Sequence, residues 1–260
     1  MDQQGLTADS ASSPSRTPEP FLIGEIMSEA WALTGGSKAL FFLGFFLIIL
    51  VSVVVTVGLH WAGGVPFDPA QSTDFSVNTL SGTHLSFASE DGLASNLISQ
   101  INNLIVGPLL AGLILYAVKR GRHDVGAGRN DIFAPYSRIF ALYGLQILQV
   151  ILIIIGFILL IIPGIYLAVA YAMTIPLLVD KELGIWASLE TSRKTISKVW
   201  FRYLGLLFAT GLVFILGSLF TLGIGLIWIL PWVFLVQGVA YRRLFGSGAL
   251  PSEVTDQSTV

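Results

Sequence analysis

The feature that most constrains the fold is an uncharged apolar run from Ile151 to Val179. A helix needs about 20 apolar residues to cross a bilayer, and extending the run back to Arg138 gives room for two crossings. Pro163 and Gly164 lie where the chain would fold back, because proline opens helices well and glycine tolerates turn dihedrals. We therefore predict a helical hairpin with a very short loop at Pro163-Gly164.

Composition places the whole chain in the same class. Apolar residues make up 54% of the chain and charged residues 12%, against roughly 25% charged residues in soluble domains. Because this number of charges is too small to cover a soluble surface, we predict an all-α polytopic membrane protein. The net charge of -2 argues against a basic nucleic-acid binder. The absence of cysteine excludes disulfides and thiolate chemistry.

Six apolar segments follow one another along the chain, and we predict that they form six transmembrane helices arranged as three hairpins. The predicted spans are 39–60, 97–118, 139–161, 164–179, 201–222 and 224–241. The fourth span is short, because its length at the helical rise is only about 24 Å. It must therefore extend past Asp180 or meet a thinned bilayer.

Basic residues give the orientation of these spans. All 14 Lys and Arg residues fall on one side of the six-span arrangement, whereas the opposite loop, residues 61–96, holds none. By the positive-inside rule we predict that both termini are cytoplasmic and that this loop lies outside. The membrane domain then covers residues 21–245. Residues 1–20 and 246–260 lack the apolar side chains needed to pack, so we expect disordered tails there.

A weak internal repeat accompanies the predicted hairpins. Ser37-Lys38, Ser137-Arg138 and Ser197-Lys198 each precede an odd-numbered span, and each even-numbered span contains a proline. Three hairpins in parallel orientation would give this pattern. Chance similarity between apolar segments is the alternative.

Residues 21–34 have an apolar helical face opposite Glu25 and Glu29, and Gly35-Gly36 can end that helix. We interpret this segment as an amphipathic helix at the membrane surface. A packed helix in a small cytoplasmic subdomain is the alternative.

Residues 183–200 carry a second apolar stripe. The residues of interest in it are Trp186, Arg193, Lys194 and Lys198. Tryptophan suits the headgroup level and basic residues attract anionic lipids, so lipid-headgroup contact is one interpretation. An interfacial linker that anchors the fifth span is the interpretation we favour. Because both surface helices lead into odd-numbered spans, we also predict that they are neighbours. Apolar contacts through Trp31 and Trp186 would then hold the acidic face beside the basic one.

The sequence predicts no catalytic, cofactor or metal site. The spans hold no ionisable side chain away from their ends, and such groups mark proton and ion paths in membrane proteins. Gln146 and Gln149 lie one turn apart on the third span and could line a polar path, but amides in membrane helices more often bond a neighbouring helix. The prolines of the even-numbered spans free backbone carbonyls that carriers can use, although kinking without function is the interpretation we favour.

The stretch IIPGIYLAVAYAMTIPLLVDKELGIWASLETSRK, residues 161–194, carries a family resemblance. It resembles the signature of the YciC-like uncharacterised bacterial inner-membrane proteins, and it is similar to the membrane domain of some bacterial glycerophosphodiester phosphodiesterases. The matching residues are Pro163, Gly164, Pro176, Asp180, Gly184, Ala187 and Ser192. The resemblance implies a bacterial cytoplasmic membrane protein with no assigned reaction. It does not imply phosphodiesterase activity, since we expect no soluble catalytic domain in this chain.

These observations leave two main functions open. The missing catalytic groups and the interfacial helices favour a non-enzymatic scaffold or accessory protein of the bacterial envelope. The proline-bearing spans and the glutamines of the third span would instead suit a carrier or channel for a small-molecule or lipid substrate. For either function the expected partner is the lipid bilayer, with anionic headgroups as a possible further contact and no nucleic acid. A membrane enzyme is the third and least favoured option.

Overall fold

Helices account for the regular structure in residues 20–63 and 90–246, the parts of the chain that this computed structural model describes. They are α1 (Ile23–Gly63), α3 (Glu90–Gly121), α4 (Asn130–Phe133), the 3-10 helix η2 (Ala134–Arg138), α5 (Ile139–Leu159), α6 (Ile161–Ala170), α7 (Thr174–Asp180), α8 (Ile185–Ser197), α9 (Trp200–Phe220) and α10 (Leu226–Phe245). The predictions for the tails, and for most of the loop 61–96, lie outside the described residues.

Several helices have the length and composition of membrane spans, as the predicted class requires. Five segments in the described residues meet that description: 23–62, 97–121, 130–159, 161–180 and 200–220. Helix α10, with 20 residues, is not among these five, and Arg242 and Arg243 in its last turn lower its mean hydropathy. The described chain is therefore all-helical, with several helices able to cross a bilayer.

Helices α5 and α6 form a hairpin, but the predicted position of its turn is wrong. The reversal occurs at Leu160, a single extended residue with φ -168° and ψ 150°. Pro163 lies in the first turn of α6, where a proline needs no N–H partner. Gly164 is buried in the same helix, and a Cβ there would stand 2.5 Å from Cγ of Phe157. The glycine therefore allows two helices to approach closely instead of forming the turn.

The fourth predicted span is divided into two short helices. A turn at 171–173 separates α6 from α7, so the single helix predicted over 164–179 is not formed. Pro176 is the third residue of α7 and is buried. Proline is tolerated in the first turn of a helix because the N–H groups there have no intrahelical partner. Pro176 thus helps to start a new helix after the break.

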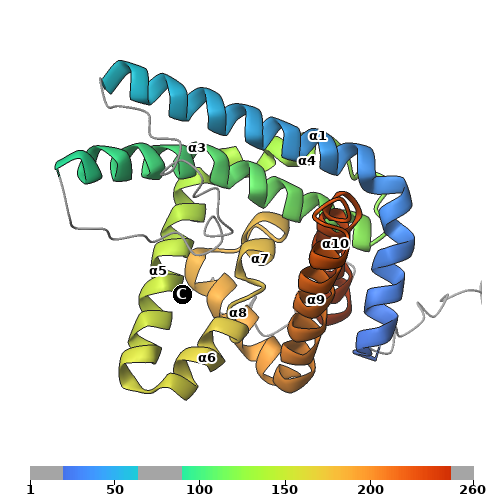
Figure 1. The fold of residues 1–260 in the computed structure, drawn as a ribbon. Coiled ribbons are helices and arrows are strands. Elements are labelled where there is room, and N and C mark those ends of the chain that lie inside the picture. The colour runs from blue at the N-terminus through green and yellow to red at the C-terminus, as the bar shows by residue number, and fades with distance from the viewer. Residues whose placement is uncertain (1–19, 64–89, 247–260) are drawn as a thin grey trace, which may run out of the picture.

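Helix α1 continues through Gly35-Gly36, so the predicted helix end at that pair is wrong. Figure 1 shows instead that α1 changes direction along its length. The hydroxyl of Thr34 donates to the carbonyl of Ala30 at 2.9 Å, and that of Ser37 donates to the carbonyl of Leu33 at 3.0 Å. Such bonds can bend a helix, and these two flank the glycine pair. The helix itself continues through Gly35-Gly36.

The first turns of α1 are packed against the rest of the fold. Ile26 and Ala30 are fully buried, whereas Leu22 and Trp31 are exposed. The indole of Trp232 in α10 donates to the carbonyl of Met27 at 3.1 Å. Residues 23–34 therefore form the packed first turns of α1 and not a separate helix.

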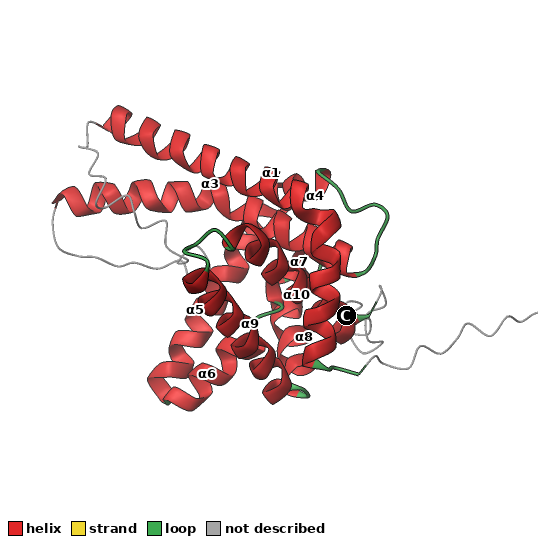
Figure 2. Cartoon of the chain, turned by 45° about the vertical axis from the view of Figure 1, so that its right-hand side comes forward, coloured by secondary structure: helices red, strands yellow, loops and turns green. Residues whose placement is uncertain are grey.

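The long helices pack as pairs (Figures 1 and 2), and their buried apolar side chains form a large core and a smaller cluster that contains buried residues of α5. Helices α1 and α3 run side by side and project together, α5 and α6 form a second pair, and α9 and α10 a third. Helix α10 also packs on both α1 and α3 and so joins the pairs. Large side chains such as Tyr203, Tyr241 and Phe41 are fully buried in this core.

Away from the core, the paired helices expose apolar side chains. Ile158 and Ile162 flank the turn between α5 and α6, and Phe220 and Leu222 lie at the turn between α9 and α10. Soluble monomers rarely expose contiguous apolar surface of this extent. The projecting ends of the pairs therefore match a hydrocarbon environment better than water.

Candidate functional site

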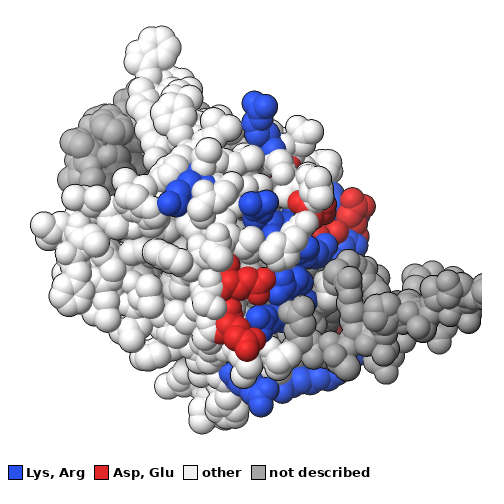
Figure 3. Space-filling model, turned by 90° about the vertical axis from the view of Figure 1, so that its right-hand side faces the viewer, with Lys and Arg blue, Asp and Glu red and all other residues white. Residues whose placement is uncertain are grey.

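Charged side chains gather where the helix pairs meet. Figure 3 shows one face of the molecule, on which Lys, Arg, Asp and Glu side chains cluster beside a broad area without charge. We name the ion-paired part of this cluster the charged junction. It consists of Glu29, Lys119, Arg122, Asp131, Asp180, Arg242 and Arg243.

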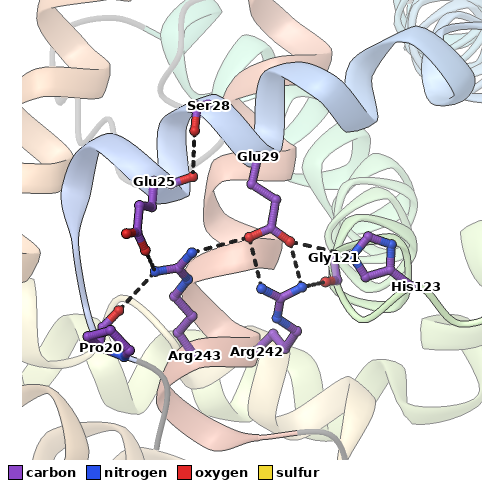
Figure 4. A network of polar contacts seen from close by, with 8 residues as sticks. All are labelled: Pro20, Glu25, Ser28, Glu29, Gly121, His123, Arg242 and Arg243. Carbon is purple, nitrogen blue, oxygen red and sulfur yellow. Dashed lines mark hydrogen bonds and ion pairs between the residues drawn. The ribbon is translucent and has the colours of Figure 1, made fainter.

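One half of the junction ties the start of α1 to the end of α10 (Figure 4). The Arg242 guanidinium donates to both carboxylate oxygens of Glu29, at 2.6 and 2.8 Å, and to the carbonyl of Gly121 at 2.9 Å. Arg243 donates to Glu25 at 2.9 Å and to the carbonyl of Pro20 at 2.8 Å. A two-point contact between arginine and a carboxylate fixes orientation as well as distance. These contacts hold together residues that lie more than 200 positions apart in the sequence.

The prediction that Glu25 and Glu29 lie beside the basic residues of segment 183–200 is wrong. Glu25 and Glu29 contact α10, whereas Arg193 and Lys194 of α8 contact Glu190 in their own helix, at 2.8 and 3.5 Å. Trp31 packs edge-on against Trp232 of α10, with ring centroids 6.4 Å apart, and Trp186 is exposed. Sequence reasoning missed this arrangement because a surface charge pattern does not reveal which distant helix supplies the partner.

The other half of the junction contains Asp180, which the sequence analysis singled out. Asp180 is ion-paired with Arg122, and its side chain is only 4% exposed. The Tyr241 hydroxyl donates to the same carboxylate oxygen at 2.8 Å. The Arg122 guanidinium also lies over the Tyr241 ring, 5.2 Å from its centroid. Asp180 thus joins the end of α7 to α10 and to the residues after α3.

Two further contacts connect the end of α3 to its neighbours. Lys119 pairs with the buried carboxylate of Asp131 in α4 at 2.5 Å, and the Gly128 amide donates to the same carboxylate at 2.8 Å. Arg120 donates to the Ser37 hydroxyl of α1 at 3.0 Å. Buried charges are costly unless they are paired and hydrogen-bonded. These pairs therefore organise the core, and none of the three junction carboxylates stands apart from a cation.

The predicted lipid-facing residues of α8 and of its C-cap, Lys198, divide into two groups. Trp186, Lys194 and Lys198 are exposed, as lipid contact requires, whereas Arg193 is half-buried. Hydrogen bonding from Arg193 lowers the pKa of Glu190, so this carboxylate remains ionised at neutral pH. Burial lowers the pKa of Lys181, which also donates to the carbonyl of Phe245 at 3.3 Å.

Ser192 has a structural role that its place in the sequence did not reveal. It is fully buried on α8 and faces the break between α6 and α7. Its hydroxyl donates to the carbonyl of Ala170 at 2.7 Å and accepts from the amide of Met173 at 3.3 Å. A broken helix leaves such backbone groups without partners, and Ser192 satisfies one at each side of the break. The only signal in the sequence was its place in the family-like stretch.

Gln149 takes part in the same region. Its side-chain oxygen accepts a hydrogen bond of 2.6 Å from the hydroxyl of Thr174, the first residue of α7. Gln146 is half-buried one turn earlier. The favoured interpretation of these amides, contact between helices, therefore holds for Gln149. A polar path through both residues stays a prediction.

An open hollow lies between the start of α5 and the start of α8. Its volume is about 370 Å³. The lining residues are Ser137, Arg138, Phe140, Ala141, Leu183, Gly184 and Ile185. Gly184, another residue of the family-like stretch, is exposed here and precedes α8. The hollow combines one cation with apolar walls.

Metal binding needs converging ligands, and within the described residues no three His, Asp or Glu side chains come close enough to hold an ion.

Comparison of this chain with protein-family models, with curated proteins and with solved structures gives no match.

Proposed function

We propose that the protein crosses a bacterial cytoplasmic membrane six times as three hairpins, with both termini in the cytoplasm. The five membrane-length segments support this proposal, and α10 is long enough to serve as the sixth span. Lys119, Arg122, Arg242 and Arg243 lie together in the charged junction, which supports a common side for the segments that carry them. Membership of the YciC-like group is part of the same proposal and rests on residues 161–194 alone.

Cysteine labelling tests this topology, because the chain contains no cysteine of its own. A cysteine at Ser89 should react with an impermeant reagent in intact cells. Lys198→Cys should react only after the cells are opened. Lys198 is preferred to Ser192, since Ser192 is buried and would resist labelling on either side. Labelling of Lys198→Cys in intact cells would overturn the orientation.

Within that topology we propose a non-enzymatic scaffold that gathers other membrane proteins in the bacterial envelope. The observation that carries this proposal is the arrangement of the helix pairs, which project from one packed core and leave apolar faces exposed along α1, α5 and α9. Helices of partner proteins can pack on such faces through van der Waals contact. The acidic and basic side chains of the charged junction are paired with one another.

Photocrosslinking in living cells tests the scaffold. A photoreactive residue at Phe208, exposed on α9, should give a discrete protein adduct, and one at the buried Tyr203 of the same helix should give none. Val54 and Ile158 probe exposed positions on the other two pairs. If all three exposed positions give lipid adducts only, the scaffold proposal fails.

The alternative is a carrier, and one observation favours keeping it. Carriers often place substrates at broken helices, and the break between α6 and α7 lies beside Gln149. Against it, Ser192 occupies backbone groups that a substrate would need. Purified protein in vesicles can be assayed for movement of a fluorescent phospholipid between leaflets. Movement that exceeds empty vesicles and falls in Gln149→Leu would favour the carrier over the scaffold.

A further inference from the structure

The hollow beside Arg138 lies at the boundary between charged and apolar surface. Arg138 immediately precedes α5, whose residue Phe140 is almost fully exposed. Across the hollow, Leu183 and Ile185 supply an apolar wall, and the exposed Trp186 follows. Exposed aromatic side chains next to a basic residue are typical of the headgroup level of a membrane. The hollow therefore faces both headgroups and acyl chains.

Arg138 is held less firmly than the arginines of the charged junction. Its guanidinium lies 3.8 Å from the Glu182 carboxylate, which is 75% exposed, and 3.4 Å from the carbonyl of Leu178. Arg242, by contrast, contacts both oxygens of Glu29 at 2.6 and 2.8 Å. The Arg138 side chain also remains 36% exposed. An incoming anion can therefore reach this guanidinium without breaking a tight ion pair.

The opposite wall leaves room for a ligand. A Cβ on Gly184 would meet no atom within 4 Å, and the backbone there has an ordinary φ of -66°. Glycine is thus not required by the fold at this position, although it keeps the hollow open. Gly184 is the N-cap of α8 and offers no side-chain cap.

We propose that this hollow binds a glycerophospholipid, with its phosphate at Arg138 and an acyl chain along Phe140 and Ile185. The positive guanidinium matches the phosphate, and the apolar wall matches the acyl chain, so the two parts of one ligand fit adjacent parts of one site. The proposal rests on the membrane location argued above, but it is independent of whether the protein is a scaffold or a carrier.

Native mass spectrometry of the delipidated protein in detergent tests the site, with phosphatidylglycerol as the probe. Arg138→Gln should weaken binding of the first lipid about tenfold. Arg202→Gln is the matched control, because it removes one exposed cation outside the hollow and should leave this binding unchanged. Equal binding by both variants would overturn the proposal. The topology does not enter this assay, so labelling and lipid binding can fail separately.

Two further arms identify what is recognised. Diacylglycerol lacks the phosphate and should bind at least tenfold more weakly than phosphatidylglycerol; equal binding would refute recognition of the phosphate. Millimolar inorganic phosphate should not displace the lipid, since it cannot contact the apolar wall. Full displacement would mean that the hollow is a free-anion site and would overturn the lipid proposal.

A second pair of variants guards against misfolding of Arg138→Gln. Gly184→Asp and Gly184→Asn introduce side chains of equal size that both cap a helix well, and the open space at Gly184 accommodates them. Only the aspartate repels a phosphate. Binding should therefore be several-fold weaker in Gly184→Asp than in Gly184→Asn. Equal binding by the two variants would count against a phosphate in the hollow.

Discussion

At the scale of single residues, the fold depends on polar side chains placed at breaks in the helices. Ser192 contacts two backbone groups across the gap between α6 and α7, and Gln149 contacts the first residue of α7. The residue types could be read from the sequence, and the interhelical role of Gln149 was favoured there. The role of Ser192 could not be predicted, because nothing in the sequence marked the break at 171–173.

Ser192→Ala should lower the free energy of unfolding by about 1–3 kcal/mol, because it leaves the buried carbonyl of Ala170 and amide of Met173 without this partner. Ser188→Ala is the matched control. Ser188 is equally buried in α8, but its hydroxyl donates to the Gly184 carbonyl of its own helix. Thermal unfolding in detergent should show the larger loss for Ser192→Ala. A loss no larger than that of the control would contradict the bridging role.

At the scale of helices, sequence periodicity and charge located the elements well but misplaced some of their ends. Helices α5 and α9 begin and end within two residues of the predicted spans, whereas α1 and α3 begin 16 and 7 residues before theirs. Two further errors fall at Gly35-Gly36 and at Pro163-Gly164. Gly35-Gly36 lies inside a helix, and Pro163-Gly164 lies past the turn. Both residue types permit a turn without requiring one, so the choice depends on tertiary packing.

Gly164→Leu should reduce the folded yield and cost about 1–3 kcal/mol of stability, because a side chain there collides with the Phe157 ring. Gly211→Leu in α9 is the matched control, since a Cβ on that helical glycine meets no atom within 4 Å. The double variant Gly164→Leu/Phe157→Ala removes the Phe157 ring and should restore part of the yield. If Gly164→Leu behaved like the control, close packing of α5 on α6 would not be the reason for the glycine.

At the scale of the whole molecule, the charged junction connects α1, α3, α4, α7 and α10. The sequence predicts that the basic residues share one side of the membrane, and in the structure four of them belong to the charged junction. It did not indicate the partners, because pairs such as Glu29–Arg242 join segments 213 positions apart. Nor did it indicate that the pairs project away from a common core, since apolar composition is the same for a helix facing lipid and one facing another helix.

The two glutamates at the start of α1 allow a direct test of this junction. Glu29 is 23% exposed and contacts Arg242 through both oxygens, whereas Glu25 is 56% exposed and contacts Arg243 through one. Glu29→Gln removes a charge that Arg242 contacts through two short hydrogen bonds at a partly buried position, so it should cost about 1–3 kcal/mol. Glu25→Gln should cost about 0–1 kcal/mol, as exposed ion pairs do. Thermal unfolding in detergent, with limited proteolysis at the start of α1, measures both effects. Equal losses in the two variants would show that burial of the Glu29–Arg242 pair does not hold α1 to α10.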